Sequence, residues 1–176
     1  MMGSGKSSVG RRLASGLGVP FVDLDVRLER MFGVSIAEAF ARGEPYFRDL
    51  ERAALSSLLR EPGFGGRMVV VATGGGAVLD PQNRAMMDGV GRRVLLRVPP
   101  AELSVRVAEG QGNDRPLIAD AEDPAHRLAG LWEQRRAAYE DVPHDVDGVG
   151  SVDTVAQRIA AVLDLELSTG ETAEPV

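Results

Sequence analysis

The feature that most constrains this chain is its only lysine. Lys6 lies in the segment Gly3-Ser4-Gly5-Lys6-Ser7-Ser8, and every other residue with a permanent positive charge is an arginine. An ε-ammonium is a compact point charge and a guanidinium is a wide planar fork, so a narrow glycine-lined loop around phosphate groups admits lysine and not arginine. The segment matches the second half of the P-loop pattern G-x-x-x-x-G-K-[ST], in which the lysine reaches phosphates and the next hydroxyl binds Mg²⁺. It therefore predicts a nucleotide phosphate site, and its candidate residues are Gly3, Ser4, Gly5, Lys6, Ser7 and Ser8.

The alternative is a chance Gly-x-Gly-Lys-Ser sequence in a glycine-rich chain. The residues after Lys6 argue against chance, because Val9, Leu13 and Leu17 recur at helical spacing before a stop signal at Gly18. A helix that begins at a glycine-rich loop presents free backbone N–H groups and the positive end of its dipole to an anion. The helix predicted over residues 7–17 thus favours a phosphate site.

Composition narrows the class of protein. The chain has 176 residues, 44% of them hydrophobic and 26% charged, which is typical of one globular domain. It contains no cysteine, which excludes disulfides, thiolate metal sites and cysteine nucleophiles. It has no long apolar stretch, no signal-peptide pattern and a net charge of −6 without a basic run. We expect a cytosolic monomer that binds neither nucleic acid nor membrane.

Predicted strands alternate with predicted helices along the chain. This order predicts an α/β fold in which a parallel sheet is flanked by helices on both faces. In such folds ligands bind beyond the carboxyl ends of the strands. The continuous apolar run 68–72 predicts a fully buried strand. The predicted strands are 21–25, 68–72 and 94–98, and the predicted helices are 7–17, 26–32, 36–42, 44–59, 81–87, 101–109, 125–142 and 152–165.

Two acidic residues and a glycine triplet follow predicted strands. Asp23 and Asp25 are two residues apart, so on a strand both side chains project to the same face. We interpret Asp23 as a support for Mg²⁺ and Asp25 as the group that orients or deprotonates an acceptor hydroxyl; the alternative is a pair of solvated acids. The triplet 74–76 either lets backbone approach a ligand closely or is only a flexible turn.

The sequence is compatible with two roles for each of three arginines. Arg135 completes the apolar stripe of the helix predicted over 125–142, so it needs an acidic partner, either a protein carboxylate or that of a substrate. Arg115 lies in the predicted mobile loop 110–124 and could close over the phosphates or remain solvated. Arg48 stands three residues before Glu51, a spacing also typical of an ordinary helix pair.

Taken together, these segments resemble the shikimate kinases, a family of P-loop small-molecule kinases. The matching pieces occur in the family's order from residue 1 to about 164, and jointly they are far more specific than the P-loop alone. They are residues 1–7, Asp23-Leu24-Asp25, Phe47-Arg48-Asp49-Leu50-Glu51, Gly74-Gly75-Gly76-Ala77-Val78, Arg115-Pro116-Leu117 and residues 135–139.

The resemblance implies the transfer of phosphate from ATP to shikimate in the synthesis of chorismate and aromatic amino acids. It also implies that residues 1–165 form a single P-loop kinase domain with a substrate-binding segment at about 26–60 and a lid at about 110–124. The composition of residues 166–176 predicts a disordered tail. The roles that the resemblance implies are as follows: Lys6 and Arg115 at the phosphates, Ser7 and Asp23 at Mg²⁺, Asp25 at the acceptor hydroxyls, Arg48 and Arg135 at the shikimate carboxylate, Glu51 at Arg48, Gly74, Gly75 and Gly76 against the substrate, and Arg106 near the adenine.

Two other functions remain open at this point. One is another P-loop metabolite kinase, such as a gluconate kinase, and the other is a nucleotide-binding protein without catalysis. In the shikimate kinases the P-loop follows a first strand, and the first glycine of the P-loop pattern would stand one position before Met1. We therefore expect the natural protein to begin upstream of Met1.

Overall fold

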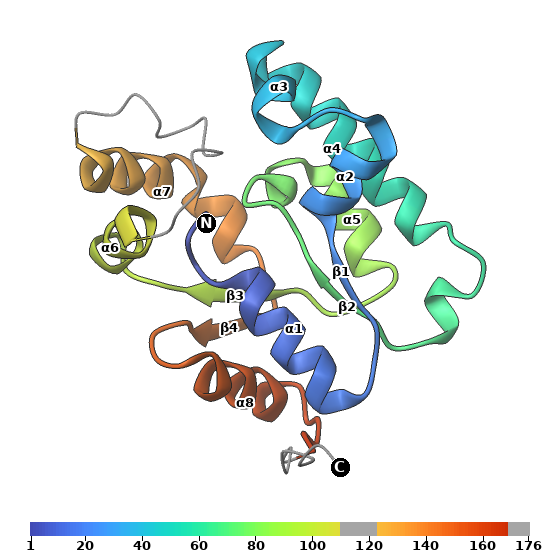
Figure 1. Cartoon of the computed structure of the whole chain (residues 1–176). Helices are drawn as coiled ribbons and strands as arrows, with labels where there is room; N and C mark the ends of the chain where they lie inside the picture. Colours follow the sequence, from blue (N-terminus) through green and yellow to red (C-terminus); the bar gives the residue numbers. More distant parts are fainter. Residues whose placement is uncertain (110–122, 169–176) are drawn as a thin grey trace, which may run out of the picture.

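The computed structural model describes residues 1–109 and 123–168 (Figure 1). Helices and short strands alternate through the described part, as the sequence predicts. The helices are α1 (Lys6–Leu17), α2 (Leu24–Phe32), α3 (Ile36–Ala41), α4 (Glu44–Leu59), α5 (Pro81–Asp88), α6 (Pro100–Glu109), α7 (Pro124–Glu140) and α8 (Val152–Val162). The strands are β1 (Phe21–Asp23), β2 (Val70–Ala72), β3 (Val94–Arg97) and β4 (His144–Asp147), and two short 3₁₀ turns are η1 (Phe64–Gly66) and η2 (Ala77–Leu79).

The described strands form two parallel pairs. In the first pair Phe21 lies opposite Val70 and Asp23 opposite Ala72, so β1 and β2 end together. In the second pair β3 lies parallel to β4, with Val94 opposite His144. Figure 1 shows the two pairs on either side of α1, which crosses in front of the space between them. The architecture is the expected α/β fold with parallel strands and flanking helices.

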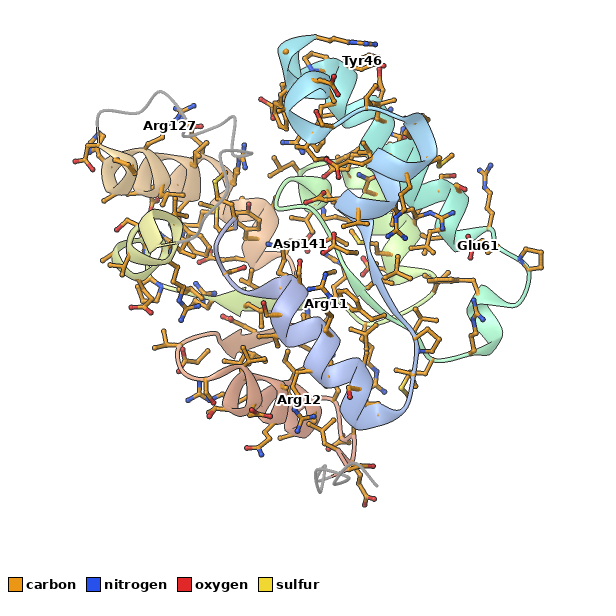
Figure 2. The ribbon with its side chains drawn as sticks, viewed as in Figure 1. Arg11, Arg12, Tyr46, Glu61, Arg127 and Asp141 are labelled. Carbon is orange, nitrogen blue, oxygen red and sulfur yellow. The ribbon has the colours of Figure 1, made fainter. Side chains whose placement is uncertain are left out.

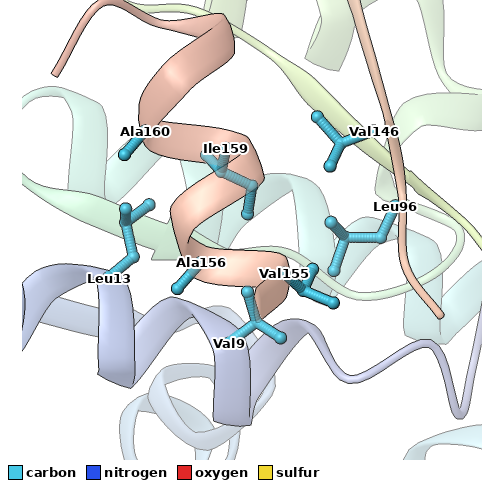
Figure 3. Packing of buried hydrophobic residues seen from close by; sticks show 8 residues of the cluster. All are labelled: Val9, Leu13, Leu96, Val146, Val155, Ala156, Ile159 and Ala160. Carbon is cyan, nitrogen blue, oxygen red and sulfur yellow. The ribbon is translucent and has the colours of Figure 1, made fainter. Parts of the chain in front are cut away.

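One part of the core joins α1 to α8 and to the second strand pair. Val9 and Leu13 of α1 pack with Val155 and Ile159 of α8, and Leu96 of β3 belongs to the same cluster (Figure 3). An ion pair of 2.5 Å between Arg12 Nε and Asp153 Oδ1 ties the same two helices at the surface, where Figure 2 labels Arg12. The helix that carries the phosphate loop is therefore anchored along its length.

A second part of the core holds the helices that follow β1. Leu24 and Leu28 of α2 are fully buried against Phe47 and Leu55 of α4, and the same cluster includes Ala39 of α3. A capping box at Ser35 fixes the start of α3, since the Ser35 hydroxyl accepts from the Glu38 N–H and the Glu38 carboxylate accepts from the Ser35 N–H. This packing positions Asp25 and Arg48 on neighbouring helices.

Several predicted boundaries are wrong for identifiable reasons. The strand expected over 21–25 ends at Asp23, because the Asp23 carboxylate caps α2, and Asp25 therefore lies in the first helical turn. The run 68–72 forms strand only from Val70, and it is not fully buried, since Met68 is 52% exposed and Val70 and Val71 are half-buried. Strand β4 was not predicted. Within the described residues no helix is long and apolar enough to cross a membrane.

Candidate active site

The phosphate loop has the backbone geometry that its glycines predict. Gly3 and Gly5 have φ values of 72° and 87°, a region that residues with a Cβ adopt at a cost, and Gly5 directly precedes α1. The Lys6 ammonium donates to the Met1 carbonyl at 2.7 Å and approaches Ser4 Oγ at 3.4 Å, so it arches back over the loop. Ser4 is buried and also donates to Met1, whereas Ser8 is exposed. The loop thus presents an ammonium group beside the N-terminus of a helix.

A hydroxyl and a carboxylate meet next to this loop. Ser7 Oγ donates to Asp23 Oδ2 at 2.5 Å, and Asp23 Oδ1 accepts from the Asp25 N–H at 3.1 Å. Both groups are hard oxygen donors of the kind that Mg²⁺ prefers, and Mg²⁺ is commonly held by one or two protein ligands with water and substrate phosphates in the remaining positions. The pair therefore fits a magnesium ion held jointly with a nucleotide. No group of three or more potential ligand residues occurs in the described ranges.

Asp25 and Glu51 converge on Gly74. A Cβ placed on Gly74 would lie 2.5 Å from Glu51 Oε1 and 2.8 Å from Asp25 Oδ1, so these two oxygens are at most about 5.3 Å apart. Both oxygens are buried, and neither has a hydrogen-bond partner among the described residues. Burial raises the pKa of Asp25 above its ordinary value, and the neighbouring Asp23 charge adds to the rise. Burial also raises the pKa of Glu51, although its partner Arg48 acts in the opposite direction.

Two arginines lie beside this pair of carboxylates. Arg48 donates from Nη1 to Glu51 Oε2 at 2.9 Å and from Nη2 to Glu44 Oε1 at 2.7 Å. Arg135 Nη2 lies 3.9 Å from the same Glu44 oxygen. The predicted inward orientation of Arg135 is confirmed, because this residue is only 9% exposed while Arg136 faces solvent. Arg48 thus binds one carboxylate oxygen of a surface residue, and Arg135 lies near the same oxygen.

The glycine triplet is packed against these groups. A Cβ on Gly76 would overlap the Arg48 guanidinium, and one on Gly75 would lie 3.4 Å from the Met1 carbonyl carbon. Tyr139 donates from its hydroxyl to the Gly75 carbonyl at 2.5 Å, and burial raises the pKa of this phenol, which keeps it a donor. The role of Tyr139 was not predicted, although this residue stands four residues after Arg135 on the same face of α7. The triplet is therefore held by α7, and a side chain at Gly74 or Gly76 would displace the charged groups packed against it.

The structure brings together all but two of the predicted site residues. Arg106 stands apart on α6, where it donates to Glu102 Oε1 at 3.1 Å and to the Gly148 carbonyl at 3.2 Å. The same helix backs the phosphate loop, since a Cβ on Gly3 would lie 3.0 Å from Val107. Arg115 lies outside the described residues. The contacts of Glu44 with Arg48 and Arg135 were not predicted, because the contact with Arg135 depends on how α4 and α7 approach each other.

A family model described as shikimate kinase matches residues 2–164. The chain belongs to the shikimate kinase family. A shikimate kinase of Geobacter metallireducens is 42% identical over 165 residues, which cover 93% of this chain and 88% of the relative. A shikimate kinase of Caldanaerobacter subterraneus is 36% identical, with 90% of this chain and 89% of the relative covered. The resemblance inferred from the motifs is confirmed.

Solved structures of shikimate kinases have the same fold. One from Bacteroides thetaiotaomicron matches with a TM-score of 0.81 and 29% identity, covering 93% of this chain and 94% of that one. Another, from Acinetobacter baumannii in complex with shikimate, matches with a TM-score of 0.81 and 33% identity, covering 93% of this chain and 89% of that one. The fold of this shikimate kinase family member therefore agrees with the family to which its sequence belongs.

Proposed function

We propose that this chain transfers the γ-phosphate of ATP to the 3-hydroxyl of shikimate, giving ADP and shikimate 3-phosphate. The observation that carries the proposal is the convergence of Asp25, Glu51, Arg48 and Arg135 around the glycine triplet, next to the phosphate loop of Lys6. Shikimate has one carboxylate and several hydroxyls. Arginine binds a carboxylate in a matching fork, and a carboxylate accepts from a hydroxyl, so the set of groups suits this acceptor.

The carboxylate of shikimate would lie between Arg48 and Arg135. The Glu44 oxygen that both guanidinium groups approach stands in for it, at 2.7 and 3.9 Å. Glu44 is nearly half exposed, so it can leave toward solvent when the substrate arrives. Glu51 is buried and keeps its hold on Arg48, which fixes one guanidinium before binding. The triplet Gly74, Gly75 and Gly76 then lies against the ring of the substrate.

The acceptor hydroxyl would lie at Asp25. Its Oδ1 is the buried acceptor that lacks a partner in the described part of the chain, so a substrate hydroxyl satisfies it. Asp25 orients that hydroxyl toward the phosphate loop and accepts its proton as the phosphoryl group is transferred. Phosphoryl transfer needs mainly positioning and charge stabilisation, and both are available here.

The phosphates of ATP would bind at residues 3–8, with Lys6 on the β- and γ-phosphates. Ser7 and Asp23 would hold Mg²⁺, which neutralises charge on these phosphates when bound. Arg115 is assigned to the γ-phosphate and Arg106 to the neighbourhood of the adenine, and both assignments rest on the family pattern. A Ser7→Ala variant tests the metal assignment, since it should lower kcat at fixed Mg²⁺ while nucleotide binding measured with EDTA changes little.

Release of ADP from ATP and Mg²⁺, with and without shikimate, tests the reaction. We expect release that depends on shikimate and that gluconate does not replace. Release with gluconate alone would identify a different metabolite kinase. Nucleotide binding without any release, in a sample that unfolds cooperatively, would identify a protein without catalysis. We also propose that the protein is a cytosolic monomer. A single peak at the monomer mass in sedimentation velocity would support the monomeric state.

A further inference from the structure

The turn η2 and the glycine triplet before it share hydrogen bonds. The Gly74 carbonyl accepts from the Ala77 N–H at 3.2 Å, and the Gly76 carbonyl accepts from the Leu79 N–H at 2.9 Å. A shift of η2 therefore moves the triplet as well. Because the Arg48 guanidinium packs against Gly76, the position of η2 also affects the groups that are proposed to bind the substrate.

Two neighbouring residues of α5 donate hydrogen bonds to this turn. Asn83, which is only 2% exposed, donates from its side-chain amide to the Ala77 carbonyl at 3.0 Å. Arg84 donates from Nη1 to the Val78 carbonyl at 2.7 Å and to the Leu79 carbonyl at 3.3 Å. Buried backbone carbonyls are almost always paired in native proteins. In η2 the side chains of α5 supply a partner for each of the three carbonyls.

Arg84 also reaches α7. Its Nε lies 3.0 Å from Oδ2 of Asp141, the residue labelled in Figure 2 that directly follows the last residue of α7. A guanidinium carries five N–H donors in a rigid plane, so it can bind a carbonyl and a carboxylate at the same time. Arg135 precedes Asp141 by six residues, which is about 9 Å along a helix at 1.5 Å per residue. Arg84 therefore joins the turn behind the triplet to the helix that carries Arg135.

A second arginine, Arg93, binds the same end of α7 without contacting the turn. It donates from Nη1 to the backbone carbonyl of Asp141 at 2.7 Å, and its Nη2 donates to the Asp88 carboxylate at 2.9 Å. Within the described residues its hydrogen bonds go to these two residues, and neither belongs to the triplet or to η2. Both arginines thus stabilise the end of α7, and of the two, Arg84 alone connects that end to the turn behind the triplet.

We propose that Arg84 is a positioning residue for the acceptor substrate, because it sets the distance between the glycine triplet and Arg135 by binding η2 and Asp141 together. Tyr139 attaches the triplet to α7 at the Gly75 carbonyl, and Arg84 adds a second attachment at η2. Two attachments fix the orientation of the triplet as well as its position. Arg84 itself contacts neither substrate. The inference rests on the proposed function, which takes the acceptor to be shikimate.

Steady-state kinetics of three variants tests the proposal, with Tm recorded for each. Arg84→Met keeps an unbranched side chain and removes the donors, and it should raise the KM for shikimate at least about tenfold while the KM for ATP changes less than about twofold. Asp141→Ala removes the carboxylate and keeps the carbonyl that Arg93 binds, and it should raise the KM for shikimate about threefold. In the double variant the second change should add nothing, because the two residues act as one unit. Arg93→Met is the matched control and should lower Tm while both KM values stay within about twofold.

An unchanged KM for shikimate in Arg84→Met would overturn the proposal. An equal rise in Arg93→Met would also overturn it, because loosening the end of α7 would then be enough. If Arg84→Met does not fold, Asp141→Ala decides, since this side chain is 63% exposed and its removal leaves little buried surface; an unchanged KM for shikimate rejects the proposal. Wild-type protein that releases no ADP with shikimate would instead refute the proposed function, so the two failures are distinguishable.

Discussion

Adding one methyl group at Gly76, by the substitution Gly76→Ala, tests the proposed binding site for the substrate carboxylate. Gly76 has φ −105° and ψ −7°, which alanine can adopt, so Gly76→Ala adds volume without backbone strain. The new Cβ would overlap Cζ, Nη1 and Nη2 of Arg48. Because non-bonded carbon contacts need about 3.5 Å, the guanidinium must move by about 1 Å or more. The substitution therefore displaces Arg48 while its charge and its chain remain.

The expected loss follows from the bond that this guanidinium would make. A hydrogen bond to a charged group contributes about 1.5–3 kcal/mol. Losing it corresponds to a rise of roughly 10- to 150-fold in the KM for shikimate, at about 1.4 kcal/mol per factor of ten. The KM for ATP should change by less than about twofold, since Gly76 lies on the substrate side of the site.

Initial rates with each substrate varied at saturation of the other provide the assay. KM does not depend on the concentration of folded enzyme, so partial unfolding of the variant does not imitate the effect, and a Tm measurement records it separately. Gly65→Ala is the matched control, because a Cβ there meets nothing within 4 Å. An unchanged KM for shikimate in Gly76→Ala, or an equal rise in both KM values, would refute the assignment of Arg48.

Three further predictions concern neighbouring groups. Arg135→Ala should raise the KM for shikimate far more than that for ATP, whereas Glu44→Gln should lower it by up to about fivefold because a half-exposed competing carboxylate is removed; steady-state kinetics tests both. Tyr139→Phe leaves the Gly75 carbonyl without its donor, and calorimetry should show Tm lower by about 2–6 °C. Burial raises the pKa of Glu51, so the native state binds the proton of this carboxyl group more tightly than the unfolded chain does. The stability that protonated Glu51 contributes is therefore fully present below its ordinary pKa of 4.5. It is lost as pH rises through the pKa of the folded state. Glu51→Gln cannot titrate at this position, and the wild-type Tm minus the variant Tm should fall as pH rises above 4.5; a constant or growing difference would contradict this.

The helices could be predicted from the sequence because their signals are local. Ser35 and Glu38 stand at capping-box spacing at the start of α3, and α1 follows the periodicity of Val9, Leu13 and Leu17. Strand β4 could not be predicted, because His144-Asp145-Val146-Asp147 offers a single apolar residue and only Val146 is buried. Its strand conformation comes from pairing with β3, which is a tertiary contact that no short-range pattern encodes.

Site residues could be predicted from the sequence where the residue type was unusual or where a polar residue lay on the apolar face of a helix. The single lysine marked the phosphate loop, and an arginine on an apolar stripe marked Arg135. Asp25 was placed wrongly on a strand, because two aspartates spaced by two also fit a helix start in which Asp23 is the cap. The contact of Tyr139 with Gly75 joins segments 64 residues apart, and only the packing of α7 establishes it.

The same packing explains why Gly74 and Gly76 carry no side chain. Gly74 leaves room for Asp25 Oδ1 and Glu51 Oε1, and Gly76 leaves room for Arg48. The two oxygens are buried acceptors whose charge is costly to desolvate, and no described group donates to them. A ligand with adjacent hydroxyls would supply the donors that these oxygens lack, and its carboxylate would replace Glu44 between the arginines. Burial is thus the main cause of the raised pKa values of Asp25 and Glu51, and it leaves two acceptor oxygens that would suit a ligand rich in hydroxyls.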